Sequence, residues 1–458
     1  MAGQAGATAR AAWSRPRDAA SDAGWTGAVG RGLAAIVVAR LAVNGGIRVV
    51  YPFLTIIAAG LGTSLETLAL LVASRALAGL AGPAMARLTR QHNPRSLMLS
   101  SQLLVTTGCL LIIAPDGTPP QVRPALVGAG FVATGLARPL FDLPMQTWVS
   151  AHVRPAARGR AVGLTEVAWA LSLAVAVPVA GVLIERTGWR SPFVLVVVMA
   201  GAGALALVVT LPPHDPERPP YATDRPVKRR RALAARRMPT GVAVAVGAAL
   251  AVAAAESLVM IHGAWLTQDV GLSVSQVGAS MMLIVVAELL GEGLVVTIAD
   301  RIGLARMLSG ALLVSAAMYA GLGVVGDHRG LVLTAIGAVF VCFEVTVVVL
   351  VALVSTAADE HGARAGLLGT LMAATACGNA VGAAVGPVLF ARGGIALAGL
   401  VSAGAATIAL VVLRHARVGR LMPSIRCGDD ASGMSSPSWR CGESNPGPDA
   451  SFPKALRA

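Results

Sequence analysis

Charged residues are scarce in this sequence. Asp, Glu, Lys and Arg make up 13% of its 458 residues, whereas hydrophobic residues make up 55%, and the mean hydropathy is +0.71. A soluble chain of this length carries about 25% charged residues, which cover its surface. The composition therefore excludes a soluble globular protein and predicts a membrane protein with several spans.

Aromatic residues are also few, at 4%, although the formal net charge is +14. A nucleic-acid-binding protein would gather its basic residues on one face, and a binder of single strands would add aromatic side chains that stack on bases. Here the arginines lie between apolar blocks instead, and Lys228 and Lys454 are the only lysines. We interpret the positive charge as a topology signal and expect no nucleic-acid partner.

The sequence lacks the patterns of metal centres, disulfide frameworks and catalytic sites. Five cysteines occur without CxxC spacing, which excludes a zinc site of that kind. No HExxH, no Gly-rich phosphate loop ending in Lys and no Ser/His/Asp arrangement is found. We expect no metal, no cofactor and no enzymatic activity.

Long apolar runs are what the sequence has in abundance. A bilayer core requires roughly 20 apolar residues per helix, and the alternating polarity of barrel strands does not occur. The predicted fold class is an all-α polytopic membrane protein with twelve transmembrane helices in two six-helix pseudo-repeat halves. The predicted spans are 33–59, 65–86, 96–114, 124–149, 160–185 and 192–211 in the first half, and 240–266, 275–299, 304–326, 330–356, 365–391 and 394–414 in the second.

The domain organisation follows from these spans. We predict a cytoplasmic tail (1–31), a six-helix bundle (32–211), a basic cytoplasmic linker (212–239), a second six-helix bundle (240–414) and a disordered cytoplasmic tail (415–458). A shift of 209 residues places Gly82 on Gly291 and Pro178 on Pro387. Parallel repeats of this kind put a substrate site between the halves near the bilayer midplane.

The end of the predicted C-terminal tail (415–458) has a second interpretation. Back-translation of "WRCGESNPGP", residues 439–448, contains the antisense of the T arm of a transfer RNA gene. One hypothesis is that the reading frame runs into such a gene, and the alternative is an ordinary disordered tail.

Arginine placement predicts the orientation in the cell membrane, because basic residues are retained on the cytoplasmic side. The loops after spans 2, 4, 8 and 10 and the linker carry most of the arginines, and they lie on the same side as both termini. Both termini are therefore predicted to be cytoplasmic.

Three stretches resemble the major facilitator superfamily over roughly residues 31–415. "GLVVTIADRIGLAR" is similar to the superfamily's cytoplasmic loop signature. Residues 158–193 resemble the fifth helix of bacterial efflux-type permeases. "GNAVGAAVGPVLF" has Gly378, Gly382 and Gly386 in one stripe, which we interpret as a packing surface. The signature residues are Gly293, Asp300, Arg301, Gly303 and Arg306.

The resemblance implies a secondary active transporter that works by alternating access and moves a small molecule, with proton-coupled efflux as the expected mode. The sequence departs from the antiporter pattern, since its first-half loop keeps Gly82 without an acid and "AVPVAG" is only part of the expected motif. An uptake symporter or facilitator is the alternative, and a non-transporting membrane sensor is a third candidate. We expect a monomer.

Charges at membrane depth are costly and mark a transport path. The resemblance implies that helices 1, 4, 7 and 10 line the central cavity. The residues predicted for the path of substrate and proton are Arg40, Asn44, Arg48, Arg138, Asp142, Glu256 and Glu344. Further charges, assigned to supporting or purely structural roles, are Arg75, Glu166, Glu288 and Glu292.

One or more of Glu256, Glu344 and Asp142 is predicted to bind the coupling proton, because a low dielectric favours a neutral carboxyl and a nearby arginine favours the charged one. The alternative is that these charges only pair and stabilise the bundle. We interpret His262 as an ordinary polar side chain, and Trp148, Trp169 and Trp265 as interface anchors.

The resemblance also implies a cytoplasmic gate around Asp300, because in the resembled fold the signature loop packs against the start of the fifth helix when the cytoplasmic side is closed. The partners of Asp300 would be Arg158 and Arg160 at the start of the fifth span, where the positive end of a helix dipole also favours an aspartate. In the first half the signs are exchanged, with arginines in the loop and Asp359 and Glu360 on the partner helix. The alternative is that all of these are solvated topology charges.

Overall fold

The computed structural model of the chain describes residues 27–114, 118–119, 121–213, 239–326, 328–356 and 363–415. Most of both predicted tails and of the basic linker lies outside these residues, together with Asp359, Glu360 and the segment of the reading-frame hypothesis. All the described helices belong to one compact unit, Met1–Met422.

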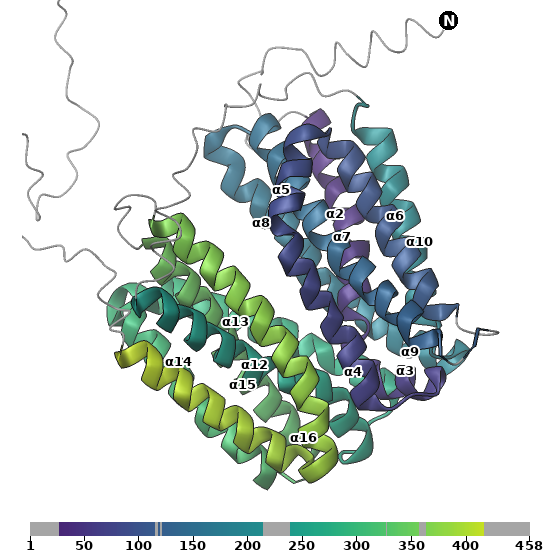
Figure 1. Cartoon of the computed structure of the whole chain (residues 1–458). Coiled ribbons are helices and arrows are strands. Elements are labelled where there is room, and N and C mark those ends of the chain that lie inside the picture. Colours follow the sequence, from purple (N-terminus) through teal and green to yellow (C-terminus); the bar gives the residue numbers. More distant parts are fainter. Residues whose placement is uncertain are drawn as a thin grey trace, which may run out of the picture. The chain divides into compact units, whose positions relative to one another are not determined.

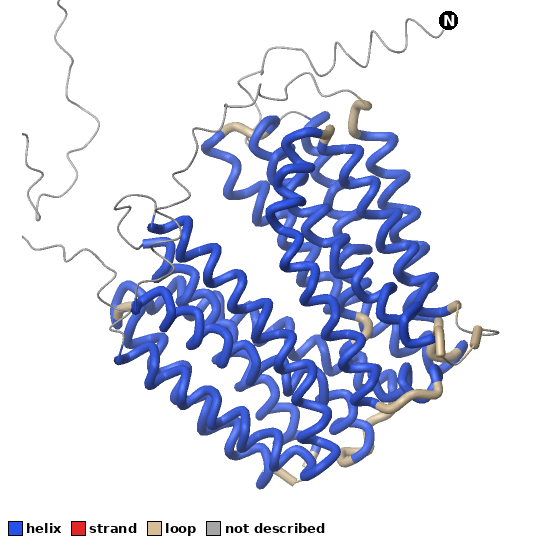
Figure 2. Tube along the Cα trace, viewed as in Figure 1, coloured by secondary structure: helices blue, strands red, loops and turns tan. Residues whose placement is uncertain are grey.

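Every described element is a helix (Figure 2). The first half contains α2 (Gly27–Arg48), η1 (Tyr51–Phe53), α3 (Leu54–Leu61), α4 (Leu65–Ala73), η2 (Ser74–Ala81), α5 (Gly82–Gln91), α6 (Pro94–Ile113), α7 (Arg123–His152), α8 (Pro155–Leu171), η3 (Ser172–Ala176), α9 (Val177–Thr187) and α10 (Ser191–Thr210). The second half contains α12 (Pro239–Gln268), α13 (Val274–Ile302), α14 (Leu304–Gly321), η4 (Leu322–Val324), α15 (Arg329–Thr356) and α16 (Ala363–His415). The prediction of an all-α fold is confirmed.

Ten of the described helical stretches are long and apolar enough to cross a membrane. Two local features explain why this number is smaller than the twelve predicted spans. The second predicted span is divided into α4, the tighter helix η2 and α5. The last two spans run together as α16, which is kinked at Gly393 and Gly394. Gly394 has φ 61°, a left-handed conformation that favours glycine.

Helix boundaries follow from local chemistry. The first span breaks after Arg48, and Pro52 lies in the first turn of the short helix η1, where its missing N–H cannot continue the hydrogen-bond ladder. Helix α13 begins with a capping box, in which Ser273 and Gln276 satisfy each other's backbone N–H groups. Such caps replace the hydrogen bonds that the first turn lacks.

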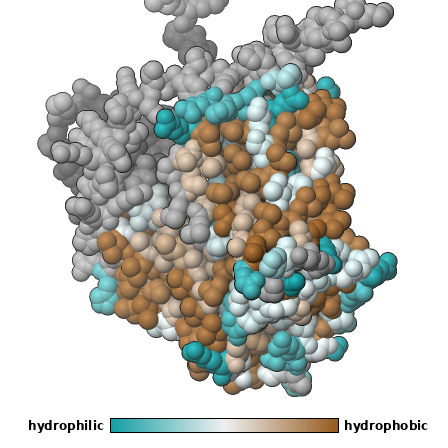
Figure 3. Space-filling model, turned by 45° about the vertical axis from the view of Figure 1, so that its right-hand side comes forward, coloured by the Kyte–Doolittle hydropathy of each residue, from teal (hydrophilic) through white to brown (hydrophobic). Residues whose placement is uncertain are grey.

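The outer surface of the helices is apolar. On the face drawn in Figure 3, hydrophobic side chains form a broad band and hydrophilic ones gather at its upper and lower edges. Leu103, Leu205 and Val296 are 68%, 65% and 79% exposed. A contiguous exposed apolar surface of this extent fits a lipid environment, and the chain is a multi-pass membrane protein.

The two halves meet tightly at the end of the helices where α9 finishes and α13 begins (Figure 1). Gly181 on α9 packs against the backbone of Val274 and Ser275, and the Glu185 carboxylate accepts a 2.8 Å hydrogen bond from the Ser275 N–H. Nearby, Gly263 on α12 lies against the carbonyl of Pro52. This is the end opposite to the predicted cytoplasmic loops, so the contacts close that side.

Candidate functional site

The polar stripe predicted on the first span lies on the buried face of α2. Arg40, Asn44 and Arg48 are 3%, 0% and 8% exposed. Four-residue spacing places them one above another on the helix. Both amide atoms of Asn44 are buried without a hydrogen-bond partner among the described residues.

Arg40 is the centre of an ion-pair network within the first half. Its Nε lies 3.0 Å from Asp142 Oδ1 on α7, and its Nη1 lies 2.9 Å from Glu166 Oε1 on α8. Nη1 also donates to the carbonyl of Thr165 at 2.8 Å. Asp142 is shared, because its Oδ2 lies 3.5 Å from Arg138 Nε one turn earlier. The intrahelical pair that the spacing permits is therefore formed.

Arg48 connects the two halves. Its Nη2 lies 3.3 Å from Glu288 Oε1 on α13. Its guanidinium carbon lies 3.7 Å from the centre of the Trp169 ring on α8, and that of Arg138 lies 4.3 Å from the same ring centre. We call Arg48, Arg138 and Trp169 the Arg–Trp–Arg cluster.

Arg75, for which sequence reasoning proposed a supporting role, stabilises the backbone where the first span is interrupted. Its guanidinium donates to the carbonyls of Ile47 at 2.9 Å and Gly46 at 3.2 Å, where α2 ends and its last carbonyls lack helical partners. It also lies over the rings of Phe131 and Tyr51. Arg75 therefore fixes the backbone next to Arg48.

Two acids of the second half face this region. The Glu256 carboxyl on α12 interacts with the Tyr51 hydroxyl and is attracted by the guanidinium groups of Arg75 and Arg48.

Glu344 on α15 lies near Glu288 and Glu292 and also near Arg48. Gly291 on α13 makes room for it, since a Cβ there would lie 2.7 Å from the Glu344 Cβ. The second half thus presents acids toward the arginines of the first half.

The gate residues lie at the opposite end of α13. Asp300, Arg301 and Arg306 are exposed, and so is Gly293. Gly303, with φ 83°, ends α13 and begins α14. The structure contains no Asp300–Arg158 pair: Arg158 donates to the carbonyls of Val153 at 3.1 Å and Ser150 at 2.7 Å. Arg160 is exposed. The gate stays a prediction for a conformation in which this end is closed.

The interpretation of the tryptophans as interface anchors is wrong. Trp148 and Trp265 are 2% and 1% exposed, so they lie in the protein core, and Trp169 lies beneath two guanidinium groups. Sequence reasoning missed the role of Trp169, although its position three residues after Glu166 was a usable signal, since it places both on one face of α8. His262 is buried, with Nδ1 2.6 Å from the Val259 carbonyl.

The glycine stripe on α16 is a packing surface, as predicted. A Cβ on Gly378, Gly382 or Gly386 would lie 2.5 to 2.6 Å from a backbone carbonyl oxygen of α12. Only hydrogen fits at these positions, so the two helices approach closely.

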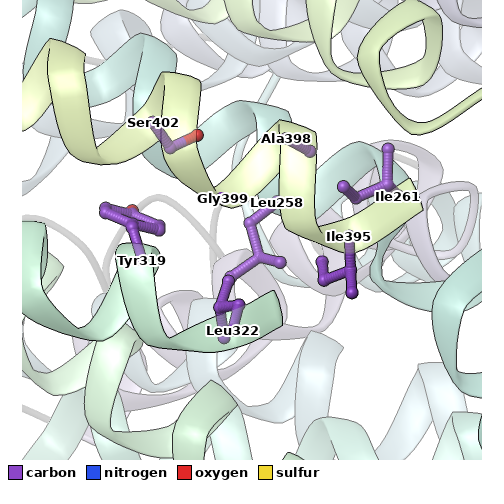
Figure 4. Close-up of a pocket in the computed structure, with 8 residues that line it drawn as sticks. All are labelled: Leu258, Ile261, Tyr319, Leu322, Ile395, Ala398, Gly399 and Ser402. Carbon is purple, nitrogen blue, oxygen red and sulfur yellow. The ribbon is translucent and has the colours of Figure 1, made fainter. Parts of the chain in front are cut away.

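A crevice between α12, α14 and α16 is drawn in Figure 4. Its lining is almost entirely apolar, with Tyr319 and Ser402 as the polar side chains, and it contains none of the predicted path residues. Within the described residues, no group of three His, Cys, Asp or Glu side chains is placed to hold a metal ion. The charged residues around α2 are therefore the candidate site.

Comparison with solved structures places this fold among transporters. A bacterial homologue of the human lysosomal transporter Spinster, in an inward-facing and unoccupied conformation, superposes with a TM-score of 0.64 at 13% identity, covering 87% of this chain and 98% of that one. The nucleoside transporter NupG superposes with a TM-score of 0.68 at 13% identity, covering 85% of this chain and 99% of that one. At this identity the likeness is one of fold.

Sequence comparison gives the family. No curated protein matches the chain. Residues 36–264, half of the chain, match the family described as the Major Facilitator Superfamily. The protein is therefore a transporter and not an enzyme, and it belongs to the Major Facilitator Superfamily.

Proposed function

We propose that the protein is a secondary active transporter that moves a small molecule across the cell membrane by alternating access, and that it works as a proton-coupled exporter. The observation that carries the proposal is the position of Arg48, which is buried at membrane depth and paired with Glu288 of the other half. An ion pair across the interface between two halves has to break or change partner when the halves move apart.

The energetic cost of breaking the Arg48–Glu288 pair supports the coupling of transport to a proton. Breaking a buried ion pair by removing one partner costs about 3–5 kcal/mol, so a proton or a charged substrate has to compensate. Glu256 and Glu344 face Arg48 from the second half, and Asp142 is shared by two arginines of the first half. These three acids are the proposed proton sites.

Flux into everted membrane vesicles tests the proposal. Vesicles containing the full-length protein receive an imposed pH gradient and one of three radiolabelled or fluorescent probes: ethidium as a cation, uridine as a neutral solute or benzoate as an anion. We expect accumulation of at least one probe, abolished by a protonophore. Glu256→Gln, Glu344→Gln and Asp142→Asn are compared with Asp269→Asn, which changes an exposed acid beyond the end of α12.

The outcomes separate the candidates. Loss of proton dependence in at least one of the three variants, with normal flux in Asp269→Asn, supports proton coupling. Unaltered proton dependence in all three removes these acids as proton sites. Accumulation only in right-side-out vesicles identifies an uptake carrier, which is the alternative, and no flux of any probe favours a sensor.

A further inference from the structure

Two arginines from different helices share one aromatic ring in this protein. Arg48 on α2 and Arg138 on α7 lie 3.7 Å and 4.3 Å from the centre of the Trp169 ring. Each cation is attracted to the ring face, but the two positive charges repel each other. A negatively charged group near both would relieve that repulsion.

Both guanidinium groups have donors to spare. A guanidinium carries five N–H donors. Arg48 directs both Nη atoms at a single oxygen, Glu288 Oε1, at 3.5 Å and 3.3 Å, and its buried Nε has no partner among the described residues. These are long contacts for a charged pair, whose usual distance is about 2.7–2.9 Å.

Arg138 is the accessible member of the Arg–Trp–Arg cluster. Its side chain is 41% exposed, and its contact with Asp142 is 3.5 Å long. The other oxygen of Asp142 lies 3.0 Å from Arg40, so Asp142 is committed mainly to that residue. An incoming ligand therefore meets Arg138 first.

We propose that the Arg–Trp–Arg cluster binds the carboxylate of a small organic monoanion, and that this carboxylate replaces Glu288 on Arg48. The inference rests on the proposed transport function and names the substrate class for it. Two planar guanidinium forks suit a carboxylate, which accepts paired hydrogen bonds from such groups.

The surrounding charges favour a single negative charge. A carboxylate that replaces Glu288 exchanges one negative charge for another on Arg48. Glu344 lies close to both Glu288 and Glu292, and the like charges of this group disfavour a dianion such as a phosphate ester.

The exchange links binding to movement of the halves. The Arg48–Glu288 pair joins α2 of the first half to α13 of the second. A ligand that displaces Glu288 removes this bond and so binds differently to the two conformations. Differential binding of this kind is what a ligand needs in order to shift a conformational equilibrium.

Calorimetry on the full-length protein in detergent tests the inference with three probes: benzoate, its neutral analogue benzamide and the dianion phenyl phosphate. We expect benzoate to bind and the other two to bind at least about tenfold more weakly: benzamide because it loses a charge-assisted contact, and phenyl phosphate because the acids near Glu288 repel its second charge. Arg138→Gln should weaken benzoate binding by about tenfold or more.

Glu288→Gln gives the decisive result, because it should increase affinity. Removing the competing carboxylate frees Arg48, and we expect benzoate to bind about tenfold more tightly. Asp269→Asn is the control, since it changes an exposed acid beyond the end of α12 and away from the cluster, and its affinity should equal that of the wild type. A misfolded variant would not bind more tightly.

Equal benzoate affinity in the wild type, Arg138→Gln and Glu288→Gln would overturn the inference, and so would tighter binding of phenyl phosphate. If a pH gradient drives ethidium or uridine while benzoate does not bind, the inference fails and the transport proposal stands. If benzoate binds with the expected pattern but no probe crosses the vesicle membrane, the inference stands and the transport proposal fails.

Discussion

The guanidinium of Arg48 on α2 lies 3.3 Å from the carboxylate of Glu288 on α13, and the two residues are 240 positions apart in the chain. This pair joins the halves within the membrane, whereas the contacts of Glu185 and Gly263 join them at one end. Sequence reasoning assigned Glu288 only a supporting or structural role. Its place opposite Arg48 makes it part of the interface that must rearrange in transport.

A double-mutant cycle measures this pair. Arg48→Met and Glu288→Gln should each lower the free energy of unfolding by about 3–5 kcal/mol, because each leaves a buried charge without its partner. The double variant should lose clearly less than the sum of the two. Chemical denaturation in detergent gives the three values. Glu292→Gln is the control and should change the stability by less than about 0.5 kcal/mol, whereas strictly additive losses would show that the pair contributes nothing.

Substitution of Arg40 should lower the free energy of unfolding far more than substitution of Glu166, although the two residues form one ion pair. Arg40→Met removes a guanidinium that is 4% exposed and leaves Asp142 without its 3.0 Å partner. We expect a loss of about 3–5 kcal/mol. The Glu166 side chain is 55% exposed, so Glu166→Gln should cost at most about 1 kcal/mol. Thermal unfolding of both variants in the same detergent checks the contrast, and similar losses for the two would contradict it.

Gly382 on α16 should not tolerate a methyl group. A Cβ there would lie 2.5 Å from the Ala253 carbonyl oxygen and 2.7 Å from the Glu256 Cβ. Gly382→Ala should therefore push α16 away from α12 and cost about 1–3 kcal/mol. Gly404→Ala on the same helix is the control, because nothing lies within 4 Å of its added Cβ. Folded yield and unfolding midpoint compare the two, and equal values would refute the packing role.

Asp300 is expected to act in the conformation that closes the predicted cytoplasmic end. Asp300→Asn removes the charge that would meet Arg158 and the start of α8, so it should favour the conformation in which this end is open. A cysteine at exposed Gln146 reports this by its rate of labelling with an impermeant maleimide in everted vesicles. The rate should rise in Asp300→Asn and stay unchanged in the control Asp269→Asn. An unchanged rate in both would count against the gate.

The prediction of spans came close to the described helices because bilayer thickness sets a length that the apolar runs must match. The two exceptions are local. At η2 the second span tightens, and at Gly393 and Gly394 the last two spans run together as one kinked helix. Hydropathy averages over such details, since it counts apolar residues and ignores backbone geometry.

The candidate site was only partly predictable. Four-residue spacing on one helix reliably indicated which charges share a face, as for Arg40 with Arg48 and Arg138 with Asp142. Partners on different helices were not accessible in this way. Trp169, expected at the membrane interface, lies under two guanidinium groups, because the rotation of α8 about its axis decides where that side chain lies.

The sequence by itself determined that this protein is helical, lies in a membrane and carries arginines in the apolar spans of its first half and acids in those of both halves. These properties follow from composition and from the cost of exposing backbone polar groups to lipid. Only the tertiary structure decided which charges meet. Pairing between α2, α7, α8 and α13 depends on how helices far apart in the chain are rotated and packed, and no local pattern of residues encodes that.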